Sequence, residues 1–408
     1  MLLHINHPSQ NCLGSLNITG SKSETNRLLL LQALYPGLTI ENRSNSDDSV
    51  AMNHALTTDS NLIDIHHAGT AMRFLTAFFA TQEGREIVLT GSSRMQERPI
   101  GVLVDALRKL GAQISYEKKE GYPPLRISGK ALKGGAVSLP ANISSQYISA
   151  LLLIAPHLEE GLSLTLEGEI TSLPYLKMTL ALLERVGVHS QFENKNIRIS
   201  QQRIIEDQTQ VVESDWSSAS YHFSCVALSS VGRIVLSSYR QDSLQGDAVL
   251  IDVYKKLGVD TRFENNQMIL EKINNFELPK TITLGLVEAP DIAQTIAVSC
   301  YGLGVACDLS GLHTLKIKET DRLIALENEL SKLGAQIRVT EDSLHLSAAQ
   351  DFKANKTIAT YSDHRMAMAF APLALKIGHQ IAEANVVTKS YPDFWNDLEA
   401  VGFELIEK

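Results

Sequence analysis

The sequence has few cysteines, and their arrangement indicates neither a disulfide framework nor a metal site. Its 408 residues include four cysteines, which are Cys12, Cys225, Cys300 and Cys307. They form no Cys-x-x-Cys pair and have no histidine at ligand spacing. We therefore expect free, buried thiols in a reducing cytoplasm, and we expect no bound metal.

Long apolar runs and targeting segments are also missing. No run approaches the roughly 18 residues that a membrane span needs, and the opening "MLLHINHPSQ" lacks the basic and apolar order of a signal peptide. The net charge of −9 argues against a protein that coats nucleic acid. A local cluster of cations can still bind small anions against the overall sign. We expect a cytoplasmic protein with small-molecule substrates and without membrane or nucleic-acid partners.

Several common catalytic signatures are absent as well. The stretch "GSKSETNR", Gly20–Arg27, contains a lysine but lacks the glycine loop that precedes it in a phosphate-binding loop. The sequence "GLGVAC" lacks the third glycine of a dinucleotide fingerprint. No GxSxG or HExxH pattern occurs. These absences exclude the usual signatures of nucleotide-binding folds, α/β-hydrolases and zinc proteases.

What the sequence does contain is a repeat of about 73 residues. The words "KLGAQI" occur at 109–114 and again at 332–337, each at the end of an amphipathic helical pattern. Glycines end five such helices at spacings of 76, 71, 76 and 68, and the position after a last turn favours a left-handed cap. These glycines are Gly111, Gly187, Gly258, Gly334 and Gly402.

A second glycine series interleaves with the first and ends another set of apolar helices. Its members are Gly37, Gly84, Gly161, Gly232, Gly304 and Gly378. A short strand follows each of these glycines, and a hairpin-like pair of strands follows each glycine of the first series. The repeat therefore reads helix, strand, helix, two strands, and the chain contains six first helices.

The last repeat is one strand short, and unassigned strands, "LLHIN" and "GSLNIT", stand at the N-terminus. We therefore predict an α/β protein of two domains with three repeats each. The first domain covers 21–213, and the second covers 1–20 with 214–408 and is closed by both termini.

Lysines and arginines crowd the predicted starts of these helices, where the helix dipole makes cations mildly unfavourable. Cations beside free backbone N–H groups form a strong anion site, although each one alone could be a solvated surface charge. They are Lys22, Arg27, Arg73, Arg94, Arg98, Lys318, Arg322, Arg365 and Lys389. Two acids stand among them, Asp291 and Glu319, either as catalytic groups or as helix caps, and nearby cations would lower their pKa.

Ten ordered blocks make the chain similar to the 5-enolpyruvylshikimate-3-phosphate synthase family. They are "GSKSETNR", "HAGTAMR", "RMQERPIG", "SSQY", "SLPY", "SSASY", "QGD", "PDIAQTIA", "KETDRL" and "DHRMAMA". The resemblance implies two domains of three βαβαββ units, with the active site in the cleft between them. It also implies transfer of the enolpyruvyl group of phosphoenolpyruvate to the 5-hydroxyl of shikimate 3-phosphate, in the shikimate pathway to chorismate and the aromatic amino acids. The enzyme would act as a monomer, need no cofactor, and close its domains on its substrates.

The resemblance assigns roles block by block. The shikimate 3-phosphate contacts would be Lys22, Ser23, Arg27, Ser144, Ser145, Gln146, Ser172, Asp291 and Lys318, with Tyr175 nearby. The phosphoenolpyruvate contacts would be Lys22, Gly69, Arg98, Gln146, Arg322, Arg365 and Lys389. Asp291 matches the proton acceptor for the 5-hydroxyl, Glu319 matches a residue proposed to protonate the methylene carbon, and Lys22 joins them as a catalytic residue.

The sequence departs from the family pattern at four positions, His67, Phe74, Thr314 and Trp216. His67 and Phe74 flank Gly69, whose missing side chain leaves room near phosphoenolpyruvate, and we expect inhibition by glyphosate. Two alternatives remain open. The sister enzyme that uses UDP-N-acetylglucosamine usually has a reactive cysteine in its first domain, but residues 13–224 contain none. An inactive relative would not need Asp291 and Glu319.

Overall fold

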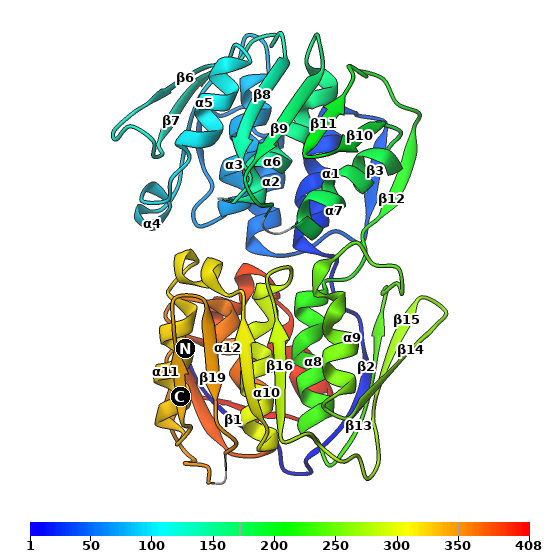
Figure 1. Cartoon of the computed structure of the whole chain (residues 1–408), viewed down its shortest axis with the longest axis vertical. Coiled ribbons are helices and arrows are strands. Elements are labelled where there is room, and N and C mark those ends of the chain that lie inside the picture. The colour runs from blue at the N-terminus through cyan, green and yellow to red at the C-terminus, as the bar shows by residue number, and fades with distance from the viewer. Residues whose placement is uncertain (143, 171–172, 350) are drawn as a thin grey trace. The chain divides into compact units, whose positions relative to one another are not determined.

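The computed structural model describes residues 1–142, 144–170, 173–349 and 351–408. The chain divides into two compact units (Figure 1). The first unit is Gly20–Val212, and the second unit combines Met1–Thr19 with Glu213–Lys408. The chain therefore passes from one unit to the other twice. No helix within the described ranges combines the length and the apolar character that a membrane crossing requires.

The first unit contains two four-stranded sheets and one two-stranded sheet among its described residues. In sheet order they are β4 (Leu62–Asp64), β5 (Glu86–Thr90), β7 (Leu125–Ser128) and β6 (Gln113–Tyr116); β8 (Gly135–Pro140), β9 (Leu162–Glu167), β11 (Asn196–Ile199) and β10 (Ser190–Glu193); and β3 (Leu38–Glu41) with β12 (Gln208–Val211). Its helices are α1 (Lys22–Leu34), α2 (Asp47–Thr57), α3 (Gly69–Ala80), α4 (Ser93–Gln96), α5 (Gly101–Lys109), α6 (Ser145–Ile154) and α7 (Leu173–Arg185).

The second unit contains three four-stranded sheets in the part of it that the structure describes. In sheet order they are β2 (Asn11–Leu16), β13 (Val231–Ser237), β15 (Gln267–Lys272) and β14 (Val259–Glu264); β16 (Thr281–Gly285), β17 (Ala306–Ser310), β19 (Ser343–Leu346) and β18 (Ile337–Val339); and β20 (Thr357–Ile358), β21 (His379–Ala382), β1 (Leu2–Asn6) and β22 (Glu404–Glu407). Its helices are α8 (Trp216–Leu228), α9 (Leu250–Lys255), α10 (Ala293–Leu303), α11 (Arg322–Lys332), α12 (His364–Phe370) and α13 (Phe394–Ala400).

The five four-stranded sheets share one topology, which is that of a βαβαββ unit. Two parallel strands lie side by side, and an antiparallel pair of strands continues the sheet beyond the second of them. The connection between the parallel strands includes a helix, which is the usual crossover for parallel pairing, and between β2 and β13 it also includes the whole first unit. In the last sheet, β1 lies between β21 and β22, with Leu3 opposite both Ile381 and Glu407. The N-terminus thus supplies the strand that the last repeat lacks.

The earliest repeat in the sequence is the exception. Strand β3 follows α1 and pairs only with β12 among the described residues, and β4, which follows α2, already belongs to the next sheet. The spacing of 47 residues between Gly37 and Gly84 explains this difference, because it leaves no length for a hairpin.

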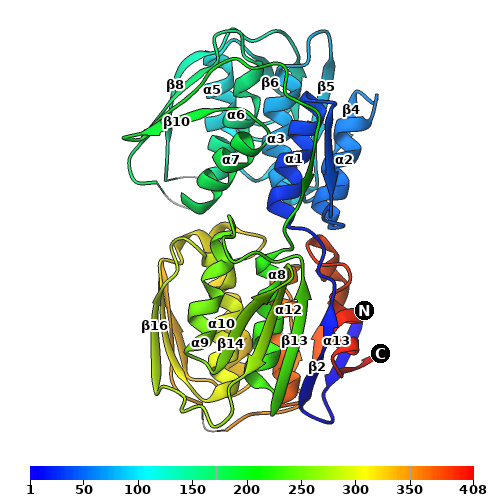
Figure 2. The same cartoon turned by 90° about the vertical axis from the view of Figure 1, so that its right-hand side faces the viewer.

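The first helix of each repeat lies in the interior, with the sheets around it (Figures 1 and 2). In α3, α6, α8 and α10, nearly every residue is buried, so these helices are enclosed on all sides. The second helices, such as α5, bury a single face. This arrangement matters for function because many of the predicted site blocks stand at the starts of the interior helices, while others precede second helices such as α5 and α11.

The five glycines of the first series all have positive φ angles, between 83° and 104°. The prediction of left-handed helix ends is confirmed at these positions.

Candidate functional site

The start of α1 places Lys22 and Arg27 in different environments. Ser21 caps the helix and accepts a hydrogen bond from the backbone N–H of Glu24. The Lys22 side chain is one-fifth exposed, and its Nζ lies 3.6 Å from a carboxylate oxygen of Asp48. Lys22 therefore keeps access to a ligand from the end of the helix.

Arg27 is buried and is held by protein groups. Its Nε donates to the Thr179 hydroxyl at 2.8 Å, one Nη donates to the Ser149 hydroxyl at 3.1 Å, and the other donates to the Ser23 carbonyl at 2.8 Å. Burial lowers the pKa of Arg27 to about 10, so it stays charged at neutral pH. Its guanidinium fastens α1 to α6 and α7, and Tyr175 contributes its carbonyl and its ring.

The starts of α3 and α6 are joined by a side-chain hydrogen bond. Ser144 caps α6 and accepts from the backbone N–H of Gln146 at 3.3 Å, and the Gln146 amide donates to the Thr70 hydroxyl at 3.1 Å. Ser144, Ser145 and Gln146 are half-buried. Three predicted contact residues are therefore accessible at one end of the first unit. Ser172, the remaining predicted serine, lies outside the described residues.

Arg98 lies directly against Gly69. A Cβ atom added to Gly69 would stand only 2.5 Å from Nη1 of Arg98. The backbone around this contact is fixed by Arg73, which is buried and donates to the carbonyls of Gly69 at 3.1 Å and Pro99 at 2.9 Å. Tyr147 donates to the same Pro99 carbonyl at 2.6 Å. Arg73 thus holds the backbone, while half-buried Arg98 remains available to a ligand.

Three of the positions that depart from the family pattern have specific contacts. His67 Nδ1 lies 2.8 Å from the Ser92 hydroxyl. The Phe74 ring packs under Arg27, with 5.4 Å between the guanidinium carbon and the ring centre. The Trp216 indole donates to Glu213 at 2.8 Å.

In the second unit, the predicted cations and acids form one ion-pair network. Asp291 precedes α10, and its carboxylate contacts Arg322 at 2.9 Å, Arg365 at 3.2 Å and Lys318 at 3.4 Å. Glu319 contacts Arg322 at 2.9 Å and Lys389 at 2.5 Å. Every catalytic or substrate-contact residue that the sequence predicted in this unit therefore belongs to a single cluster.

A third acid, Asp363, completes the network, and the sequence reading did not single it out. It caps α12 by accepting from the backbone N–H of Arg365 at 2.9 Å, and it accepts from Nε of Arg322 at 2.6 Å. Both Asp363 and Arg322 are buried. The sequence "SDHRM" indicates that Asp363 caps a helix, but a helix cap does not reveal that the same carboxylate also binds Arg322.

Ser217 and Asp247 were also missed. Arg365 donates to the Ser217 hydroxyl at 3.3 Å, and Ser217 donates to Asp247. Burial, together with the nearby charge of Asp291, raises the pKa of Asp247 to about 6. These contacts bring the starts of α8, α10 and α12 together around Arg365.

The two predicted catalytic acids are ionised in this network. Burial by itself would raise the pKa of Asp291, but Arg365, Lys318 and Arg322 outweigh it and hold that pKa well below its usual range. Burial likewise opposes ionisation of Glu319, and Arg322 and Lys389 hold the pKa of Glu319 well below normal. At neutral pH both carboxylates are therefore ionised, and Glu319 has no proton to donate in this state.

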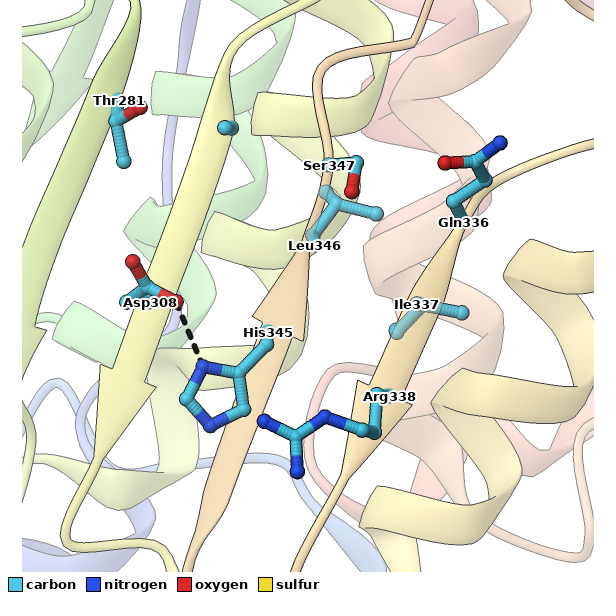
Figure 3. Close-up of a pocket in the computed structure, with 9 residues that line it drawn as sticks. Thr281, Asp308, Gln336, Ile337, Arg338, His345, Leu346 and Ser347 are labelled. Atoms are coloured by element: carbon cyan, nitrogen blue, oxygen red, sulfur yellow. Dashed lines mark hydrogen bonds and ion pairs between the residues drawn. The ribbon is translucent and has the colours of Figure 1, made fainter.

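A separate hollow of about 480 Å³ lies on the sheet formed by β16, β17, β19 and β18 (Figure 3). Asp308 and His345 face each other across adjacent strands there, with 2.6 Å between Oδ1 and Nδ1. None of the predicted site residues lines this hollow. Within the described ranges, no group of three or more His, Cys, Asp or Glu side chains is placed to hold a metal ion.

Comparison with known proteins gives one consistent family. The sequence model described as EPSP synthase (3-phosphoshikimate 1-carboxyvinyltransferase) matches residues 56–398. A 3-phosphoshikimate 1-carboxyvinyltransferase of Bacteroides fragilis is 44% identical over 400 residues, covering 97% of each chain. The protein of that name from Haemophilus influenzae is 36% identical, covering 95% of this chain and 96% of its own. The solved EPSP synthase of Acinetobacter baumannii matches the whole fold with a TM-score of 0.82 at 21% identity, covering 100% of both chains.

Proposed function

The chain belongs to the EPSP synthase family, and from this premise we propose how its residues carry out the family reaction. The enzyme transfers the enolpyruvyl group of phosphoenolpyruvate to the 5-hydroxyl of shikimate 3-phosphate and releases phosphate. The product is 5-enolpyruvylshikimate 3-phosphate, an intermediate of the shikimate pathway. The observation that carries the residue assignment is the network in which Asp291, Glu319 and four cations contact one another.

Shikimate 3-phosphate is assigned to the accessible helix starts of the first unit, together with Asp291 and Lys318 of the second. Half-buried Ser144, Ser145 and Gln146 offer hydroxyl and amide groups beside a helix N-terminus, which suits a phosphate. Ser23 and Ser172 join this set by resemblance alone. Arg27 is assigned a supporting role in this binding surface, because most of its N–H donors already bind protein groups.

Phosphoenolpyruvate is assigned to Arg98 above Gly69, to Gln146 and Lys22, and to the cations Arg322, Arg365 and Lys389 of the second unit. The planar guanidinium groups suit its carboxylate and phosphate oxygens. In the free enzyme, Asp291 and Glu319 occupy these cations. The substrate anions take over part of that pairing when they bind.

Asp291 acts as the proton acceptor. As the 5-hydroxyl oxygen forms its bond to C2 of phosphoenolpyruvate, the hydroxyl proton passes to the ionised Asp291 carboxylate. The same step adds a proton to the methylene carbon, giving a tetrahedral adduct. Loss of a proton from that carbon then expels phosphate and restores the double bond, while the surrounding cations stabilise the negative charge of the leaving group.

Glu319 fits the role of the acid only after phosphoenolpyruvate has bound. Its low pKa depends on Arg322 and Lys389, which are also assigned to the substrate. Anions that engage these two cations weaken their attraction for Glu319 and raise its pKa toward neutrality. Lys22, one-fifth exposed at the start of α1, is the second candidate for proton transfer.

We further propose that the two compact units act as the domains 21–213 and 1–20 with 214–408, and that residues of both domains bind the substrates. The four free, buried cysteines support a cytoplasmic location, and residues of one chain supply every assigned contact, which supports a monomer. Light scattering during size-exclusion chromatography tests the monomer.

Phosphate release tests the assignment directly. Purified enzyme should release phosphate from phosphoenolpyruvate when shikimate 3-phosphate is present, and it should release none with UDP-N-acetylglucosamine or with no acceptor. Activity with the UDP-sugar alone would transfer the assignment to the sister enzyme. Absence of turnover with either acceptor would indicate an inactive relative.

A further inference from the structure

The segment 359–363 leads from β20 into α12 in a strained conformation. Tyr361 and Ser362 have φ angles of 56° and 54°, in the left-handed region that side chains other than those of glycine and asparagine seldom adopt. Two such residues in succession persist only where surrounding contacts hold them. Asp363, the acid that contacts Arg322 and caps α12, follows directly.

Glu329 of α11 supplies those contacts from one side. Its side chain is fully buried, and its carboxylate accepts from the Tyr361 hydroxyl at 2.7 Å and from the backbone N–H of Ala359 at 3.1 Å. Lys332, one turn further along the helix, lies 2.7 Å from the same carboxylate and balances its charge. A buried carboxylate with three donors is strongly ordered.

Arg322 and Glu329 lie on the same face of α11, because seven residues make almost two turns of a helix. Arg322 binds Asp363, and Glu329 binds Ala359 and Tyr361. The strained segment is therefore bound to α11 at two positions along the helix, and Arg322 provides one of these contacts.

The other side of the segment leads toward Lys389. The Thr360 hydroxyl donates to Glu383 at 3.2 Å, and the Thr360 carbonyl accepts from the backbone N–H of Asp363 at 2.9 Å. Glu383 precedes the short helix Ala384–Lys389, which ends at Lys389. Segment 359–363 thus contacts Arg322 and Arg365 through Asp363, and through Thr360 it contacts Glu383, which precedes the helix that ends at Lys389.

We propose that Glu329 is a positioning residue for phosphoenolpyruvate: through Tyr361 it holds segment 359–363 so that Asp363 aims Arg322 and Arg365 at the substrate. This inference rests on the proposed function, because that function assigns both arginines to phosphoenolpyruvate. Glu329 itself has no access to a ligand, so its effect is indirect.

The primary test compares Tyr361→Phe with the matched control Tyr301→Phe. Tyr301 is fully buried, and its hydroxyl donates to the Leu333 carbonyl at 2.6 Å, just beyond the end of the same helix. Both variants lose one hydroxyl that contacts this helix region, and the control loses the more buried one. We expect KM for phosphoenolpyruvate to rise about tenfold in Tyr361→Phe and less than about twofold in Tyr301→Phe, since a tenfold change is typical for one hydrogen bond to a charged group. KM for shikimate 3-phosphate should change less than about threefold in both variants.

Rescue by a conservative change provides the second measurement. Glu329→Gln keeps a carbonyl oxygen that can accept from Tyr361, whereas Glu329→Ala removes the acceptor. We expect Glu329→Gln to recover most of the phosphoenolpyruvate affinity that Glu329→Ala loses. Thermal unfolding of all four variants separates this effect from loss of folded protein.

Equal KM values for phosphoenolpyruvate in Tyr361→Phe and Tyr301→Phe would overturn the proposal, as would parallel losses for both substrates. Amide hydrogen exchange at residues 359–365 gives a readout that does not depend on turnover. Faster exchange there in Tyr361→Phe than in Tyr301→Phe supports the positioning role even if the wild type fails the phosphate-release assay, and unchanged exchange refutes it. The phosphate-release assay of the wild-type enzyme alone decides whether the proposed function fails.

Discussion

Arg322 is the residue on which the second-unit site depends. It is buried and contacts three carboxylates, those of Asp291, Glu319 and Asp363. Buried ion pairs of this kind add little net stability, because desolvation offsets much of the attraction, but removal of one partner leaves the others unpaired at high cost. Because the network adds little stability, its presence is better explained by function. Because removal of one partner is costly, conservative substitutions are the appropriate tests.

Replacement of Asp291 by asparagine tests the proton acceptor. The amide keeps the size of the side chain but cannot take the hydroxyl proton, so kcat should fall about 100- to 10,000-fold. Asp308→Asn is the control, because Asp308 is an aspartate of the same unit whose carboxylate contacts His345 outside the network. Single-turnover measurements should show the loss in the chemical step. A kcat within a few-fold of the wild type would remove Asp291 from its assigned role.

Replacement of Gly69 by alanine tests the phosphoenolpyruvate contact. The new Cβ would meet Nη1 of Arg98 at 2.5 Å, and the flexible guanidinium must move away. KM for phosphoenolpyruvate should rise about tenfold or more, because a charge-assisted contact is lost. Inhibition of the wild type by glyphosate is expected below millimolar concentration, and the variant should need more inhibitor.

Gly101→Ala is the matched control, since Gly101 also begins a helix of the first unit, and its nearest neighbour to a new Cβ lies 3.3 Å away. Thermal unfolding should show both variants folded, because alanine favours helix more than glycine does. The same KM for phosphoenolpyruvate in the two variants would mean that Arg98 does not contact this substrate, and wild-type activity unaffected by millimolar glyphosate would contradict the expected inhibition.

At the scale of elements, the interior helices position the site. Each begins where its repeat places polar and cationic residues, and the contacts among Ser217, Asp291 and Arg365 bring three of these starts together in the second unit. The apolar bodies of α8 and α10 are buried on all sides, so their ends have little freedom to move.

Strand β21 carries a buried histidine whose ionisation links the stability of the second unit to pH. His379 is fully buried, its Nδ1 lies 3.1 Å from the Ile377 carbonyl, and burial lowers its pKa from 6.5 to about 4. The unfolded chain therefore binds the proton more readily between these two values, and stability decreases as pH falls through this window. The loss amounts to about 1.4 kcal/mol per pH unit, or about 2 kcal/mol at pH 5.

His379→Asn keeps a hydrogen-bond donor near the Nδ1 position and removes the titration. The stability of the variant relative to the wild type should therefore be about 2 kcal/mol greater at pH 5 than at pH 8. Urea unfolding at the two pH values measures this difference, and groups that titrate in both proteins, such as Asp247 with its raised pKa, cancel. A difference that is constant with pH would show that folding does not lower the pKa of His379.

At the scale of the whole molecule, the proposed substrate contacts come from both compact units. Lys22, Arg98 and Gln146 belong to the first unit, whereas Arg322 and Lys389 belong to the second. Substrates that bind to both sets should draw the units together, which aligns the reactants and excludes water.

Small-angle scattering tests this closure. The Asp291→Asn variant with both substrates should show a smaller radius of gyration than the same variant without ligands, because it consumes the bound substrates only slowly. Shikimate 3-phosphate alone should give a smaller change. Scattering curves that do not change with both ligands present would argue against closure.

The sequence by itself determined the repeat, because glycines at helix ends and alternating strands are local features with a fixed period. It also determined the family and the cations at the helix starts, since ordered blocks survive as a linear pattern. Only the tertiary structure decided which charges meet. Asp363, Ser217 and Asp247 were missed, and Arg73 and Arg27 proved to hold protein groups, because side chains far apart in the chain become partners only when the interior helices pack. The ionised state of Glu319 was likewise beyond the sequence, since its pKa balances burial against the distances to Arg322 and Lys389.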